Sequence, residues 1–160
     1  MRTLSRTTPA FIVAGALLLT FPLTAPTSAD DSVYFSAKFF NNSAVSIKVE
    51  ILHTDGSLQK DDRVNPGNHK TFHFGSTKCK YTKTRRFRIY ERLNNTVIAT
   101  GTFAMTSGPS IGWNECNPDR SDFQFLECAD TPNDAFAVRC ALNEKSREGR
   151  RGMVYVTSGS

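Results

Sequence analysis

Two segments of this chain alternate, with few exceptions, between apolar and polar residues, and this pattern constrains the fold more than any other feature. The segments are residues 44–52 and 85–93. A period of two residues is typical of a β-strand that buries one face and exposes the other. The side chains predicted to point into a core are Val45, Ile47, Val49, Ile51, Phe87, Ile89 and Leu93.

A hairpin is predicted directly after the second alternating segment. Asn94 and Asn95 indicate a turn, because asparagine tolerates positive φ better than most residues. A three-residue loop with a bulge, residues 94–96, sets apolar residues opposite apolar residues, whereas a two-residue loop does not. The predicted partners are Leu93 with Val97, Ile89 with Gly101, and Phe87 with Phe103.

Further strands are expected at residues 33–40, 71–75, 97–105 and 153–156, and residues 57–63 suit a loop or a weak edge strand. Pro66-Gly67 fits a type II turn. Phe123, Phe125, Phe136 and Val138 predict a last hairpin. Six to eight short strands with frequent turns favour an all-β fold, an antiparallel β-sandwich that is Ig-like in architecture only.

The N-terminus predicts export. Arg2 and Arg6 precede an almost uncharged apolar run, and small residues follow it before Asp30, as in a secretory signal peptide. The run, residues 10–23, is shorter than the ~20 residues that span a bilayer. We therefore expect a signal peptide at 1–29, a sandwich domain at 30–142 and a charged tail at 143–160 with at most a short last strand. The expected location is secreted or periplasmic, with no membrane span in the mature protein.

Four cysteines in an exported chain predict two disulfides. They are Cys79, Cys116, Cys128 and Cys140. Of three connectivities, we favour Cys79–Cys116 with Cys128–Cys140, since the latter pair flanks the predicted last hairpin. No CxxC spacing occurs, so the pattern does not favour a metal site.

Charge is unevenly distributed along the chain. Residues 78–92 hold seven bases and one acid, whereas residues 115–134 hold six acids and one base. The outward phase of the basic strand could bind a polyanion bidentately through arginine. Two other interpretations stay open: the two segments neutralise each other, or the charges protect an edge strand from aggregation. The candidate ligand-binding residues are Lys78, Lys80, Lys83, Arg86, Arg88, Tyr90 and Arg92.

Trp113 is the only tryptophan and lies in a loop rich in Gly, Pro and Asn near Cys116. A loop tryptophan can anchor a protein partner, or it can plug the end of the core beside a disulfide. Asn41 and Asn94 each begin an N-glycosylation motif, which matters only in a host that modifies it.

The sequence gives little support for catalysis. Its Gly-x-Ser-x-Gly match, Gly108 to Gly112, lies in a loop-like segment and is explained by loop composition, and the chain has no Gly-rich phosphate loop and no close histidine pair. The sequence therefore predicts a secreted, non-enzymatic binding module without a cofactor, contacting an anionic glycan, a cell-surface polymer or an acidic protein surface through the basic strand. Nucleic acid is not favoured. The alternative is a secreted effector or inhibitor that acts on a protein partner through the Trp113 loop.

Overall fold

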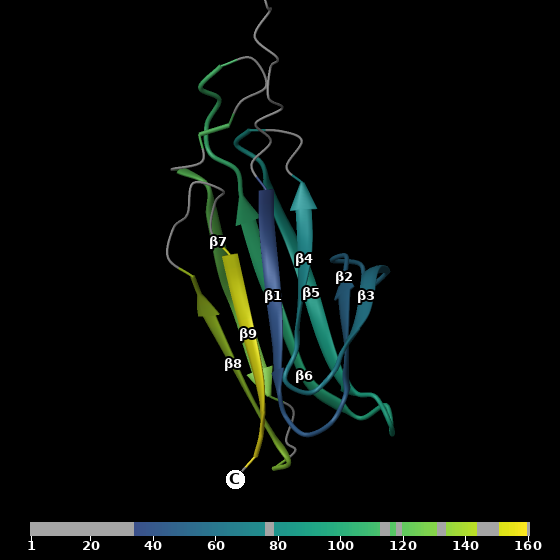
Figure 1. Cartoon of the computed structure of the whole chain (residues 1–160). Helices are drawn as coiled ribbons and strands as arrows, with labels where there is room; N and C mark the ends of the chain where they lie inside the picture. The colour runs from purple at the N-terminus through teal and green to yellow at the C-terminus, as the bar shows by residue number, and fades with distance from the viewer. Residues whose placement is uncertain are drawn as a thin grey trace, which may run out of the picture.

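The computed structural model describes residues 34–75, 79–112, 116–117, 120–130, 134–143 and 151–159. Nine strands in these residues form two sheets (Figure 1). The four-stranded sheet contains, in spatial order, β4 (His69–Gly75), β1 (Tyr34–Asn42), β9 (Arg151–Ser158) and β8 (Phe136–Leu142). The five-stranded sheet contains β3 (Leu58–Val64), β2 (Ile47–Leu52), β5 (Thr82–Glu91), β6 (Val97–Thr106) and β7 (Asp122–Asp130).

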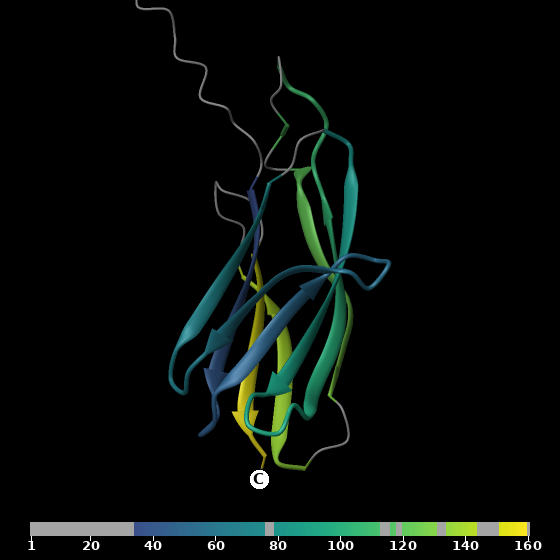
Figure 2. The same cartoon turned by 90° about the vertical axis from the view of Figure 1, so that its right-hand side faces the viewer.

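The two sheets pack face to face as a sandwich, as predicted, and appear as separate layers in Figure 2. Phenylalanine rings fill the space between them. Phe103 stacks on Phe123 with ring centroids 5.0 Å apart, and Phe39 meets Phe87 edge to face at 5.5 Å. Such pairs contribute about 0.5–1.5 kcal/mol each beyond their area burial. Aromatic contacts therefore join neighbouring strands of one sheet, as with Phe103 and Phe123, as well as the two layers, as with Phe39 and Phe87.

The apolar phase of the alternating segments points inward, as the period of two predicts. Ile47, Val49, Ile51 and Ile89 are fully buried, and Phe87 is nearly so. Leu93 was expected to join them, but that prediction is wrong: Leu93 is 88% exposed. The reason is that β5 ends at Glu91, so Leu93 lies in the turn rather than in the strand.

The register of the β5–β6 hairpin also differs from the prediction. Phe87 lies opposite Gly101 and Arg85 opposite Phe103, with a bulge after Ile89. The observed pairing differs by two residues, so each side chain keeps its predicted face. At the centre of the hairpin a large residue faces a small one, because the Phe87 ring occupies the space above Gly101, where a Cβ would lie 2.2 Å from the ring. Volume complementarity, rather than apolar likeness, sets the register.

Two connections between the sheets depend on turn residues. The Pro66-Gly67 turn carries the chain from β3 to β4, with Gly67 at φ 73° and a hydrogen bond from the Asn68 N–H to the Asn65 carbonyl. After β1, which continues through Asn42, the buried Asn41 donates from Nδ2 to the carbonyls of Val45 and Val64. Asn41 thereby fixes the bend into β2.

Both predicted disulfides are confirmed. Cys79 is bonded to Cys116, and Cys128 on β7 is bonded to Cys140 on β8. The predicted hairpin between β7 and β8 is wrong, however, because these strands belong to different sheets. β8 pairs instead with β9, and the Cys128–Cys140 bond links the two sheets across their adjoining edges.

The last strand is longer than the expected residues 153–156 and takes a more central place. β9 lies between β1 and β8 and pairs with β1 in parallel. Val154 and Val156 are fully buried in the core. Residues 151–158 therefore belong to the four-stranded sheet and lie between two of its strands. In the part of the chain that the structure describes, no helix is long and apolar enough to span a membrane.

Candidate functional site

The predicted basic strand is β5, and the structure places its outward phase on the outer face of the five-stranded sheet. Arg86 is exposed, and Arg88 and Tyr90 are half-buried beside it. Lys80 precedes the strand at φ 58°, and Lys83 is half-buried within it. Arg92 is exposed in the turn after β5. Lys78 and Trp113 lie outside the described residues, so the predicted roles of both stay predictions.

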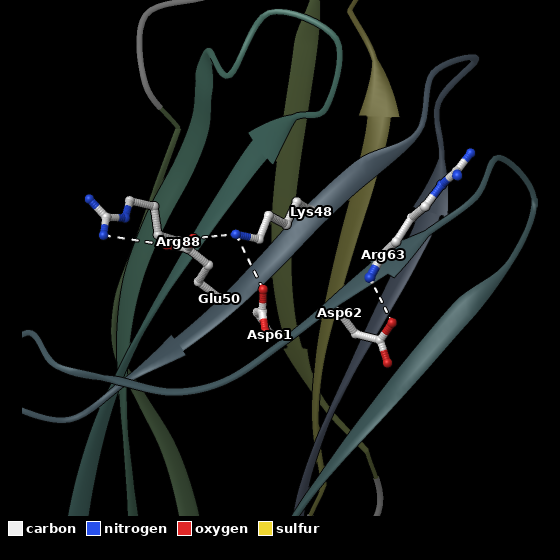
Figure 3. A network of polar contacts seen from close by, with 6 residues as sticks. All are labelled: Lys48, Glu50, Asp61, Asp62, Arg63 and Arg88. Atoms are coloured by element: carbon white, nitrogen blue, oxygen red, sulfur yellow. Dashed lines mark hydrogen bonds and ion pairs between the residues drawn. The ribbon is translucent and has the colours of Figure 1, made fainter.

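Carboxylates from the neighbouring strands neutralise part of this row. Glu50 on β2 lies between two cations, with Lys48 Nζ at 2.8 Å and Arg88 Nη2 at 3.4 Å (Figure 3). Lys48 also reaches Asp61 on β3, 3.2 Å away. Hydrogen bonds to Glu50 and Asp61 raise the pKa of Lys48, and burial raises the pKa of Tyr90. Arg88 is therefore already paired within the protein.

The charge of the whole five-stranded sheet sums to zero. Its seven acids are Glu50, Asp61, Asp62, Glu91, Asp122, Glu127 and Asp130. Its seven bases are Lys48, Lys60, Arg63, Lys83, Arg85, Arg86 and Arg88. Seven minus seven gives a neutral sheet. The sequence segment around β5 is strongly basic, but β2, β3 and β7 supply matching acids once the strands pair.

The four-stranded sheet has the opposite composition, because none of its four strands contains an acidic residue. Its bases are Lys38, Lys70, Arg139 and Arg151, to which His69 and His73 add titratable groups. Lys70 pairs with Asp62 of β3 at the sheet edge. The other three bases lie on the outward phase of their strands. This sheet is the positively charged face of the sandwich.

A row of stacked side chains crosses the outer face of this sheet. The ring centroids of Phe40 and Tyr155 are 4.7 Å apart with the planes 9° from parallel, and His69 lies 5.5 Å from Phe40 on the other side. The register aligns these residues across β4, β1 and β9. Arg139 of β8 ends the row, its guanidinium carbon 4.9 Å from the centre of the Tyr155 ring.

The stacking determines what the row can present to a ligand. Phe40 and Tyr155 cover each other's faces, so the row does not offer a free flat platform for a sugar ring. Aromatic rings are negative on their faces and positive at their edges. Lys38 Nζ, 4.7 Å from the Phe40 centroid, and Arg139 satisfy those negative faces. The row therefore holds two cations in fixed positions and is suited to an anion.

Among the described residues, no carboxylate lies within ion-pair distance of Lys38 or Arg139. Their charge thus remains available at the surface, unlike that of Arg88 on the opposite sheet. We refer to Lys38, Phe40, His69, Arg139 and Tyr155 as the cation–aromatic row.

A shallow groove of about 410 Å³ lies between the edge strands β3 and β4. Lys60 crosses it to donate from Nζ to the His73 carbonyl at 2.6 Å, and Lys70 pairs with Asp62 beside it. These contacts bind the two sheet edges together. The described residues contain no group of three or more His, Cys, Asp or Glu arranged to hold a metal ion.

Sequence reasoning missed the cation–aromatic row. Lys38 and Phe40 lie on the outward phase of a strand that was recognised only for its inward residues. Tyr155 lies in the short strand expected at residues 153–156, for which no outward face was considered. The available signal was the complete lack of acids in the segments that became β1, β4, β8 and β9. No protein-family model matches the chain, and no curated protein matches it either.

Proposed function

We propose that this protein is an exported, non-enzymatic module that binds an anionic glycan or cell-surface polymer through the outer face of its four-stranded sheet. The observation that supports this most is the lack of any acid in that sheet, combined with unpaired cations fixed on a stacked row. The ligand class follows from the sequence prediction. The proposed binding surface differs from the predicted one, because it lies on the four-stranded sheet rather than on β5.

The geometry favours a flexible polyanion over a small neutral sugar. The stacked rings expose their edges, and Lys38 and Arg139 on the outer face have no carboxylate within ion-pair distance among the described residues. Sulfate or uronate groups along a glycan would meet Lys38 and Arg139, on strands separated by β9. The two disulfides are compatible with an oxidising compartment, where such polymers occur.

The test measures binding of the purified, oxidised protein to heparin and to polygalacturonate, with dextran as the neutral comparison. Affinity for a polyanion should fall steeply as salt rises from about 50 to 300 mM. We expect Lys38→Gln/Arg139→Gln to weaken binding roughly 30-fold, since each basic side chain near an anionic surface contributes about 1 kcal/mol.

A matched control removes two positive charges from the other sheet. Arg86 and Arg92 are both exposed and belong to the predicted basic strand and its turn. The variant Arg86→Gln/Arg92→Gln has the same net charge as the first variant, and we expect it to retain most of the affinity. Circular dichroism and thermal unfolding would establish that both variants fold.

Three results would contradict the proposal. Equal weakening by the two variants would show that net charge, rather than this face, determines binding. Greater weakening by the Arg86/Arg92 variant would return the site to β5. Single-stranded DNA of equal charge that displaces heparin and binds more tightly would identify a nucleic-acid surface instead.

A further inference from the structure

Arg85 occupies an unusual position for a charged residue. It lies on the inward phase of β5, together with Phe87 and Ile89, and is opposite the fully buried Phe103. Only 8% of Arg85 is exposed. Arginine is almost never this buried unless it is paired with an acid, because removing a charge from water is costly.

The neutral partners of Arg85 satisfy only part of its guanidinium. Nε donates to the Oε1 of Gln59 on β3 at 2.5 Å, and Nη1 donates to the carbonyl of Thr84 at 2.7 Å. A guanidinium has five N–H donors. Three of them have no acceptor among the described residues.

Arg85 also lacks a counter-ion in the described part of the chain, where none of the ion pairs includes it. Burial lowers the pKa of Arg85, and the nearby phenol of Tyr81 opposes that shift only in part. Tyr81 is half-exposed, which places Arg85 near the protein surface. The Nη2 group of Arg85, which has no acceptor among the described residues, is not one of the buried atoms without a partner and therefore reaches solvent. A guanidinium with free donors can bind an oxyanion bidentately.

We propose that Arg85 is the centre of a second binding site, which takes an oxyanion group (a carboxylate, sulfate or phosphate) on the free N–H groups of its guanidinium. This site is independent of the proposed polyanion surface, since it lies on the inward side of the five-stranded sheet. Its ligand is either a small free anion or the acidic end group of a larger molecule.

The test follows the side-chain resonances of Arg85 in protein labelled with ¹⁵N-arginine. The Nε–H of Arg85 is buried and hydrogen-bonded, so its exchange with water is slow enough for detection. Arg85→Lys identifies the resonance by its loss. The probes are phosphate, sulfate, acetate and glucuronate at constant ionic strength. We expect a saturable shift with a dissociation constant of about 1–10 mM.

The probes distinguish the two sources of ligand. Tighter binding of phosphate or sulfate identifies a small free anion, and tighter binding of glucuronate identifies an acidic end group. Either result supports the site. Failure of the glycan to bind the outer face of the four-stranded sheet would leave this result unaffected.

Gln59→Glu offers a test that retains Arg85. It places a carboxylate where Arg85 Nε already donates, and so provides an internal counter-ion. We expect anion binding to weaken at least tenfold and the melting temperature to rise. Gln124→Glu is the control, since it adds the same charge on the exposed face of β7. No saturable shift with any probe, or equal binding by Gln59→Glu, would show that Arg85 is purely structural.

Discussion

The ring of Phe87 covers Gly101 so closely that a Cβ on residue 101 would lie 2.2 Å from the Phe87 Cε1 and 2.7 Å from the Glu127 carbonyl oxygen. β6 therefore packs between a side chain of β5 and the backbone of β7. The lack of a side chain at residue 101 therefore determines the register of the β5–β6 hairpin and also allows β7 to pair closely with β6.

Gly101→Ala should destabilise the protein by about 1–3 kcal/mol, because overpacking of a buried position forces the neighbours to move. Urea unfolding measures the loss. Thr102→Ala is the matched control, because Thr102 is the next residue in β6 and is only half-buried. If Gly101→Ala were as stable as wild type, the close contact with Phe87 would not determine the register.

Asn41 should be essential to the fold. Its Nδ2 donates at 2.7 and 2.9 Å to two carbonyls, and its Oδ1 accepts from the N–H and the hydroxyl of Ser43. Asn41→Ala should lower the free energy of unfolding by about 2–4 kcal/mol, because buried groups lose their partners. Asn42→Ala, one exposed residue away, should change it by less than about 0.5 kcal/mol. Similar losses in the two variants would contradict this role.

The two glycosylation motifs should behave differently in a host that modifies them. A glycan on Asn41 Nδ2 is incompatible with the fold, since that atom is buried and donates to Val45 and Val64. Asn94 is exposed in the hairpin turn. We expect secreted, folded protein to carry one enzymatically removable glycan, and Thr96→Ala to carry none. A glycan retained in the Thr96→Ala variant would contradict the prediction.

Because of the Asp62–Lys70 ion pair, the free energy of unfolding should decrease as the pH becomes acidic. Hydrogen bonds from Lys70 and from the Arg63 N–H lower the pKa of Asp62 below its usual 3.8. A carboxyl group with a depressed pKa stabilises the fold above its unfolded pKa and loses that effect as the pH falls through its folded pKa.

Asp62→Asn should therefore reduce the free energy of unfolding at neutral pH by about 0.2–1 kcal/mol, the usual range for an exposed pair. The difference from wild type should disappear in acid, once the pH has fallen below 3.8 and through the lowered pKa of Asp62. Urea unfolding at both pH values measures it, and Lys70→Gln should show no further loss in the Asp62→Asn background. A difference that persists in acid would assign the effect to packing.

Loss of the inter-sheet disulfide should be costly. Cys128 and Cys140 are separated by 12 residues, a loop whose closure corresponds to about 3 kcal/mol in the chain-entropy model. Cys128→Ser/Cys140→Ser should lower the melting temperature accordingly, and mild reduction of wild type should approach the same value. A variant that melts at the wild-type temperature would show that the β7 and β8 edges associate without the bond.

Sequence periodicity correctly predicted those features of the fold that depend on a single strand. The inward faces of β2 and β5 followed from alternation, because burial of one face requires a period of two residues. The hairpin register did not follow, because it depends on the shape that Phe87 and Gly101 form together. Both disulfides were predicted, but the connection between β7 and β8 was not, because β9 competes successfully for pairing with β8.

Charge was predicted least well, for a physical reason. A sequence segment shows the charges of one strand, whereas a ligand meets those of a whole sheet. Arg88 appeared available until Glu50, 38 residues earlier in the chain, proved to lie beside it. The cation–aromatic row likewise needs β1, β4, β8 and β9 together, and these come from both ends of the described chain.

The strands of the two sheets differ in charge, and this difference contributes an electric dipole directed across the thickness of the sandwich. The strands of one layer sum to four positive charges, and those of the other sum to zero. A negatively charged surface would orient the molecule before any contact forms, with β1 and β9 facing the surface and β2 and β5 facing away. Only one side of the protein would then remain accessible to whatever approaches next.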